Sequence, residues 1–481
     1  MKFFLPFLFF LVSFSSCKKA LEEKPKSIAA EVFYNTSAEV AAGVNAIYTP
    51  LRTDACLGGL YLVQLEVYSD YLYGRGSHAP LNDYQGLDNN NITRVGNMWN
   101  SFYLSIRNAN IIIKNAPRGN NISQDDITKY VSEARFLRAL AYFDLVRNWA
   151  GVPLRTENNM DSIDVKRSSA TDVYNFIIDD LTYAETNLPE VPRLEGAPSK
   201  WSAKTVLADV YLNLQNWSEA KSKALEVIES NKFSLVNVST SDDFEKLYGA
   251  DIGTTAEEIF YLKFSRQPSQ GFAYVIYAHY PNAGYFPPGG YYTDYSDTLL
   301  NPVVKNWDRK DLRFDYNWYS QTFGLGDATV LNRKFRDPKT TTGAGNDYPM
   351  YRYADLLLLY AEAESRLNNG PTADAMEKLN MVHRRAYGKS PTVPDESVDF
   401  KLASYNSSQS FLDLLTKEKC YETAYEGKRW LDLKRLGIVK EVIQQTKGKT
   451  VAAKHLLWPI PATEYNYNKA IDPVKDQNPG Y

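Results

Sequence analysis

The stretch SQDDITKYVSEARFLRALAYFDLVRNW, residues 123–149, carries the strongest helix signal in the chain. Ser123 can cap the first turn, and two aspartates follow it where the helix dipole is positive; Gly151 and Pro153 end the helix. The apolar residues recur at intervals of three and four, which places them on one helix face: Ile127, Val131, Ala134, Leu137, Ala141 and Leu145. The stretch predicts a long helix.

Further helices are predicted downstream, the first at residues 170–188. Residues 203–214 and 220–227 form a pair of short helices around the turn Gln215-Asn216, with small residues on the facing sides. A helix pair in a unit of about 34 residues is typical of a tetratricopeptide repeat. Two more pairs are predicted at 351–387 and 411–437, and such repeats are stable when stacked. The expected fold is therefore mainly α, with a tetratricopeptide-like helical-repeat scaffold.

Two stretches of the sequence lack helical spacing. Glycine, proline, asparagine and aromatic residues dominate about residues 231–349, with short strand-like pieces such as 258–264. Residues 60–97 are similarly rich in tyrosine, asparagine and glycine. From residue 271 to 320, Phe, Trp and Tyr account for 14 of 50 residues, against 14% in the whole chain. We expect these stretches to be long loops on the scaffold, where binding residues tend to lie.

The N-terminus has the pattern of an export signal. Lys2 precedes an apolar run at 3–12, shorter than the ~20 residues of a membrane-spanning helix, and small residues lead to Cys17. We expect residues 1–16 to be a lipoprotein signal peptide and Cys17 to be lipidated; a plain signal peptide with an incidental cysteine is the alternative. Residues 17–481 are expected to form a single domain, with scaffold at about 30–230 and 350–440, a loop-rich insert at about 231–349 and a C-terminal tail at 441–481.

Charge and motif content exclude several classes of protein. Lys and Arg total 54 against 57 Asp and Glu, so no basic excess indicates nucleic acid. The four histidines show no metal-ligand spacing, and no nucleophile elbow, P-loop or Rossmann glycine motif occurs. We therefore expect no enzyme, no catalytic or metal-ligating residue and no cofactor.

Two side-chain groups need separate interpretation. Glu418, Glu422 and Glu426 lie four apart on one predicted helix face beside Lys and Arg residues. This spacing favours a structural ion-pair network over a glycosidase carboxylate pair. Cys56 and Cys420 could form one disulfide or remain buried thiols.

Aromatic residues in the irregular stretches are the candidates for ligand binding. Flat rings stack on the apolar faces of sugars, while a few polar groups orient the ligand. The alternative role for such rings is to attach the loops to the scaffold. We predict that at least two of five residues contact the ligand: Tyr73, Arg75, Tyr291, Tyr292 and Trp307.

Several segments resemble the SusD/RagB family of outer-membrane nutrient-binding lipoproteins. Residues 133–146 read EARFLRALAYFDLV and are followed by GVPL at 151–154; residues 352–363 read RYADLLLLYAEA. Residues 426–437 read EGKRWLDLKRLG, LWPIP follows at 457–461, and the chain ends on QNPGY. The order of these segments makes the resemblance specific, with minor departures such as His383 where an arginine is usual.

The resemblance implies about four tetratricopeptide-like helix pairs and a variable, loop-rich second part. It implies a lipid-anchored protein at the cell surface, in the outer membrane, which binds an oligo- or polysaccharide and delivers it to a SusC-like TonB-dependent transporter. The alternatives are a peptide ligand, as in some branches of the family, and less favoured a carbohydrate-active enzyme or a tetratricopeptide adaptor for proteins. The shared motifs belong to the scaffold, so the resemblance assigns no ligand-binding residue.

Overall fold

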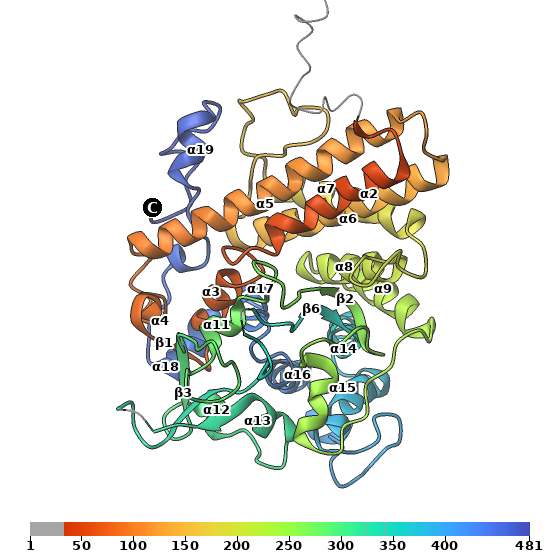
Figure 1. Ribbon diagram of the computed structural model, residues 1–481. Coiled ribbons are helices and arrows are strands. Elements are labelled where there is room, and N and C mark those ends of the chain that lie inside the picture. The colour runs from red at the N-terminus through yellow and green to blue at the C-terminus, as the bar shows by residue number, and fades with distance from the viewer. Residues whose placement is uncertain (1–32, 323, 342) are drawn as a thin grey trace, which may run out of the picture.

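A stack of helices dominates the computed structural model, which describes residues 33–322, 324–341 and 343–481 (Figure 1). The predicted lipidation site Cys17 lies outside these residues. The scaffold consists of α2 (Ser37–Leu51), α5 (Asn89–Asn115), α6 (Gln124–Trp149), α7 (Ala170–Asn187), α8 (Lys200–Asn213), α9 (Trp217–Glu229), α14 (Tyr353–Leu367), α15 (Ala373–Ala386) and α16 (Ser408–Glu422).

The scaffold helices pack in sequence order. Helix α2 packs on α5, α5 on α6, α6 on α7, and α7 on α8; α8 pairs with α9, which packs on α14, and α14 packs on α15 and α16. This order confirms the predicted mainly α fold with stacked helix pairs, including the pairs α8–α9 and α14–α15. Within the described residues, no helix is both long and apolar enough to cross a membrane.

Helix α6 lies at the centre of one end of the stack, because α2, α5, α7 and α8 all contact it. Its N-terminal turn is capped as predicted, with the Ser123 side chain accepting a hydrogen bond from the backbone of Asp126. Ala134, Leu137 and Ala141 are fully buried. Since the helix has neighbours on several sides, burial extends beyond the apolar face that the spacing predicts.

The C-terminal motifs dock onto the end of α6. The Trp149 indole donates to the carbonyl of Pro459 at 2.8 Å, and its ring lies edge-on to Trp458 with centroids 4.9 Å apart. The Asn478 side chain donates to the carbonyls of Trp149 and Trp458 at 3.0 and 2.7 Å. The bond from Asn478 satisfies the carbonyl of Trp149, which the end of the helix leaves without a backbone partner. The segments LWPIP and QNPGY thus both attach the C-terminal tail to α6.

The prediction that residues 60–97 form an irregular stretch is partly wrong. It contains α3 (Leu60–Tyr68), α4 (Ala79–Asn82) and the start of α5. Residues 61–68 of α3 are all buried, so this helix has no polar face and shows no amphipathic spacing. The predicted helix pair at 411–437 is present as α16 and α17 (Arg429–Arg435), joined by a turn at 423–428 in which Tyr425 and Gly427 adopt positive φ angles. Because α16 ends at Glu422, Glu426 lies in this turn and not on the helix face where it was predicted.

Short strands tie the loop-rich part together. An antiparallel sheet has the order β1 (Tyr73–Gly74), β3 (Asp294–Asp297), β5 (Thr329–Asn332) and β4 (Trp318–Ser320). A second sheet pairs β2 (Glu258–Leu262) with β6 (Tyr348–Arg352), which leads directly into α14. The remaining helices are short: α10 (Glu245–Tyr248), α11 (Tyr274–Ala278), α12 (Pro302–Lys305), α13 (Leu312–Asn317), α18 (Val439–Lys447) and α19 (Ala462–Tyr467).

The three glutamates of α16 and the following turn form a buried ion-pair network, which confirms the structural interpretation. Glu422 pairs with Arg352 at 2.7 Å, and Glu426 pairs with Arg352 at 2.9 Å and with Lys334 at 2.7 Å. Glu418 pairs with Arg313 at 2.6 Å. Buried charges of this kind require partners, because desolvation penalises an isolated ion heavily.

Cys56 and Cys420 are both buried free thiols. Of the two alternatives that the sequence left open, the structure therefore has the unpaired one. Burial raises the pKa of the Cys420 thiol to about 12, which keeps it protonated and unreactive.

Candidate functional site

The two irregular stretches of the sequence meet where β1 pairs with β3. Tyr73 lies opposite Tyr295 in the antiparallel register, with ring centroids 5.4 Å apart. Directly after β1, the backbone N–H of Arg75 donates to the carbonyl of Thr293 at 2.7 Å. In Figure 1, β1, β3 and α4 all lie below the same end of the helical stack. Pairing of these strands brings residues 73–78 and 291–295 to one place.

Arg75 and Tyr292 are held against each other. The guanidinium donates to the Tyr292 carbonyl at 3.0 Å and lies 3.8 Å from the centroid of its ring, a cation–π geometry. Tyr292 has a φ of 37°, a backbone conformation that residues other than glycine rarely adopt. Strained residues of this kind cluster at ligand-binding sites.

Tyr291 presents its ring to solvent. Its side chain is 64% exposed, and its ring lies 5.8 Å from that of Tyr277, centroid to centroid. The preceding Gly290 allows the loop to approach α11 closely, because a Cβ there would lie 2.2 Å from the carbonyl oxygen of His279. The backbone N–H of Tyr291 also donates to the carbonyl of Ile276 at 2.7 Å, so the exposed ring stands on a fixed backbone.

A hollow of about 340 Å³ opens between these segments and the N-terminal end of α5. Its volume falls within the range of small-ligand sites. Arg94 of α5 donates to the Ser77 side chain at 2.7 Å and to Asn91 at 2.9 Å. Burial and the charge of Arg94 lower the pKa of His78 to about 3, so this imidazole is neutral. The lining residues are Arg75, Gly76, Ser77, His78, Arg94, Tyr277, Tyr291 and Thr293.

The structure brings four of the five predicted binding residues together. Arg75 and Tyr291 line the hollow, Tyr292 packs on Arg75, and Tyr73 lies in the adjoining strand, where its hydroxyl is 3.4 Å from the amide nitrogen of Asn301. Contact of these residues with a ligand remains a prediction.

Trp307 lies apart from the hollow and is only 2% exposed. Its ring stacks on Tyr421 of α16 with centroids 4.0 Å apart, and its indole N–H donates to Asp311 at 3.0 Å. These contacts attach the loop to the scaffold. We therefore propose no ligand contact for Trp307.

Sequence reasoning missed six residues of the lining: Gly76, Ser77, His78, Arg94, Tyr277 and Thr293. Gly76, Ser77 and Thr293 are close in sequence to Arg75 and Tyr291, which were predicted. Tyr277 lies within the aromatic-rich stretch and could have been included on that signal. Arg94 lies on a helix and His78 is buried, and neither position carries a local pattern that indicates a site.

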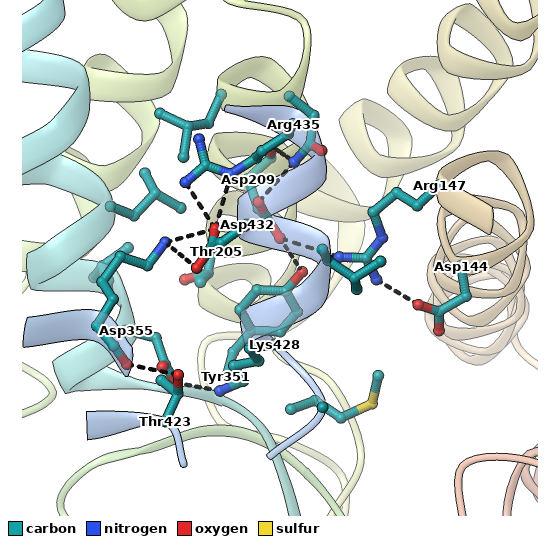
Figure 2. Close-up of a pocket in the computed structure, with 18 of the residues that line it drawn as sticks. Asp144, Arg147, Thr205, Asp209, Tyr351, Asp355, Thr423, Lys428, Asp432 and Arg435 are labelled. Atoms are coloured by element: carbon teal, nitrogen blue, oxygen red, sulfur yellow. Dashed lines mark hydrogen bonds and ion pairs between the residues drawn. The ribbon is translucent and has the colours of Figure 1, made fainter. Parts of the chain in front are cut away.

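A second hollow lies inside the helical scaffold between α6, α8, α14 and α17 (Figure 2). Figure 2 shows paired charged side chains around it: Arg147 with Asp144 on the same helix, and Lys428 with Asp355 at 2.8 Å. Asp432 likewise pairs with Arg435 at 2.7 Å. The hollow measures only about 80 Å³, which is too small for a sugar ring, since ligand sites usually span ~300–1,000 Å³.

In the described part of the chain, no three His, Cys, Asp or Glu side chains are arranged to hold a metal ion. The residues that line the hollow beside β1 and β3 carry aromatic rings, guanidinium groups, an imidazole and hydroxyl groups. Such a lining can stack on a flat apolar face and donate hydrogen bonds to oxygen atoms.

Comparison with known proteins agrees with the fold. Residues 20–212 match a family described as "Starch-binding associating with outer membrane", and residues 289–481 match the "SusD family". A SusD-like protein of Formosa agariphila is 28% identical over 490 residues, 93% of this chain and 93% of that protein.

Solved structures share the same architecture. A SusD homologue from Bacteroides thetaiotaomicron superposes with a TM-score of 0.80 at 23% identity, over 94% of this chain and 98% of the homologue. A "laminarin binding SusD-like protein" superposes with a TM-score of 0.73 at 23% identity, over 93% of this chain and 100% of that one. The two matched regions and the relative that is similar along nearly its whole length establish that the chain belongs to the SusD/RagB family, and the solved structures share its fold.

Proposed function

We propose that this chain binds an oligo- or polysaccharide at the hollow beside β1 and β3 and does not act on it chemically. The observation that carries the proposal is the exposed ring of Tyr291 above a hollow that is lined by Arg75 and Arg94. A flat ring accepts the apolar face of a sugar, and guanidinium groups donate to its hydroxyls. The structurally similar protein described as laminarin-binding supports a saccharide ligand.

The distribution of carboxylates supports binding without catalysis. Glycoside hydrolysis uses two carboxyl groups that flank the scissile bond. Among the described residues, no Asp or Glu lines the hollow. Glu418, Glu422 and Glu426 are buried in ion pairs, where a substrate has no access.

Affinity electrophoresis against a panel of polysaccharides, including laminarin, tests the proposal. With the polysaccharide that retards the protein, Tyr291→Ala should lose about 1–3 kcal/mol of binding free energy, as expected for a contact residue. Tyr467→Ala is the matched control, because Tyr467 is 76% exposed but lies on α19. Unchanged retardation of Tyr291→Ala would place the site elsewhere, and binding of peptides alone would favour the peptide alternative.

We also propose that the chain is a lipoprotein anchored through Cys17 at the cell surface, in the outer membrane. The pattern of residues 1–17 and the family description of outer-membrane association support this location. Labelled palmitate should enter the wild type and not Cys17→Ser, because the acyl chains need the thiol for attachment. Equal labelling of both would contradict the anchor.

A SusC-like TonB-dependent transporter is the proposed partner that receives the saccharide. Membership of the SusD/RagB family supports this assignment. A tagged copy purified in mild detergent should bring down a large outer-membrane barrel protein. Repeated recovery of the chain alone would contradict the partnership.

A further inference from the structure

The charges around the hollow are unbalanced. Two of its lining side chains, Arg75 and Arg94, carry a permanent positive charge, and in the described part of the chain no carboxylate lines it. His78 adds no charge at neutral pH, since burial and Arg94 lower its pKa to about 3. Among the described residues, the charged side chains that line the hollow are therefore all positive.

Arg94 is partly buried, and among the described residues its hydrogen-bond partners are neutral. Its guanidinium donates to the Ser77 carbonyl at 3.2 Å, to the Ser77 hydroxyl at 2.7 Å and to the Asn91 side chain at 2.9 Å. Buried arginines elsewhere in the chain are neutralised: Arg138, for example, forms a two-pronged pair with Asp180 at 2.7 and 2.9 Å. A planar guanidinium matches a carboxylate or a sulfate in the same two-pronged way.

Three carboxylates lie near these two arginines, and none of the three lines the hollow. Asp294 of β3 lies near Arg75 but is buried, and burial raises the pKa of its carboxyl well above the usual value. Asp54 accepts a hydrogen bond from the Tyr277 hydroxyl at 2.9 Å. Asp88 caps α5 by accepting from the backbone N–H of Asn91 at 2.9 Å. Both lie close enough to Arg94 to influence it, but neither bonds to it or lines the hollow, so an anionic ligand can approach without meeting a carboxylate.

We propose that this hollow selects a saccharide that carries an oxyanion, either a uronate carboxylate or a sulfate ester, with Arg94 and Arg75 as the groups that bind it. The inference rests on the proposed saccharide-binding function and adds the ligand's charge to it. The oxyanion supplies the negatively charged partner that Arg94 lacks among the described residues, while the ring of Tyr291 packs on the sugar face beside it.

The test compares polysaccharides that share a backbone and differ in charge. Polygalacturonate and its methyl ester probe the carboxylate, and dextran sulfate and dextran probe the sulfate; laminarin serves as a neutral reference. In affinity gels the full chain should bind one acidic form about tenfold more tightly than its neutral counterpart. This preference should shrink as NaCl rises from about 50 mM to about 500 mM, because salt screens the attraction.

Arg94→Gln should bring the ratio of acidic to neutral affinity close to one. Arg118→Gln is the control, because it removes the same charge from an exposed arginine beyond the opposite end of α5 and should leave the ratio unchanged. Arg94→Lys keeps the positive charge but loses the two-pronged hydrogen bonding of the guanidinium. This variant should therefore retain part of the preference for the acidic polysaccharide, together with its salt dependence. The lysine variant keeps the test decisive if the glutamine variant melts at a lower temperature.

Three outcomes separate this inference from the proposed function. A salt-sensitive preference that Arg94→Gln abolishes supports it, and the pair that shows the preference identifies the oxyanion. Binding of laminarin or another neutral polysaccharide without preference for either acidic form overturns the inference and leaves saccharide binding in place. Failure of every polysaccharide to bind overturns the proposed function, and the inference with it.

Discussion

Replacement of Arg352 by Met should destabilise the protein, because Arg352 lies in the middle of the buried ion-pair network. Its side chain is 0% exposed. One terminal nitrogen donates to Glu422 at 2.7 Å and the other to Glu426 at 2.9 Å. Methionine is of comparable length and apolar, so Arg352→Met removes the charge and its hydrogen bonds while it fills much of the space.

The magnitude follows from what the two carboxylates retain. Removing one partner of a buried ion pair typically costs about 3–5 kcal/mol. After Arg352→Met, Glu422 still pairs with Arg313 at 3.2 Å and with Arg385, and Glu426 with Lys334 at 2.7 Å. We therefore expect the lower end of the range, about 3 kcal/mol of unfolding free energy, which should lower Tm by roughly 3 °C in a chain of this length.

The effect should depend on pH. Burial raises the pKa of Glu422, but Arg385, Arg352 and Arg313 outweigh burial and hold it at about 2. Because this value lies below the unfolded pKa of about 4.3, Glu422 stabilises the fold above that pH and loses its contribution as pH falls towards 2. Arg352→Met raises the folded pKa of Glu422. The Tm difference from the wild type should therefore be largest near neutral pH and narrow towards about pH 3.

Thermal melting from about pH 3 to about pH 8 measures this effect. Arg107→Met is the matched control, because Arg107 is exposed on α5 and such substitutions usually change stability by less than about 0.5 kcal/mol. If Arg352→Met melts like the wild type at pH 7, or if its deficit is the same at every pH, the electrostatic explanation of the network is wrong.

Three further predictions concern packing. Trp307→Ala should lower the unfolding free energy by about 3–5 kcal/mol with little change in saccharide affinity; an unchanged Tm with lost affinity would return Trp307 to the binding site. Gly290→Ala should weaken binding in affinity gels, because the new Cβ would lie 2.2 Å from a backbone oxygen and displace Tyr291; wild-type affinity would show that the loop adjusts freely. Cys56 and Cys420, both buried thiols, should react with a thiol reagent only after unfolding; fast labelling of the native protein would contradict their burial.

Whether the sequence predicted a helix depended on what surrounds that helix in the fold. Helices α7 and α9 each bury a single face, with Val173, Ile177 and Leu181 in α7 and Ala220, Ala224 and Val227 in α9, and this apolar spacing is a local property that the sequence displays. Helix α3 is surrounded by protein, so it lacks a polar face and resembles an irregular stretch. The turn at 423–428 depends on backbone conformations at Tyr425 and Gly427, which periodicity does not report.

The site shows the same division between local pattern and tertiary structure. The sequence by itself determined the helical scaffold and the family resemblance, and it identified two aromatic stretches that supplied Arg75 and Tyr291, because residue type and spacing are local. Only the tertiary structure decided which rings face solvent: Tyr291 is exposed, whereas Trp307 is buried. Only the tertiary structure brought Arg94 to the hollow. The physical reason is that strand pairing between β1 and β3 joins segments more than 200 residues apart, and burial depends on what the rest of the fold packs against each side chain.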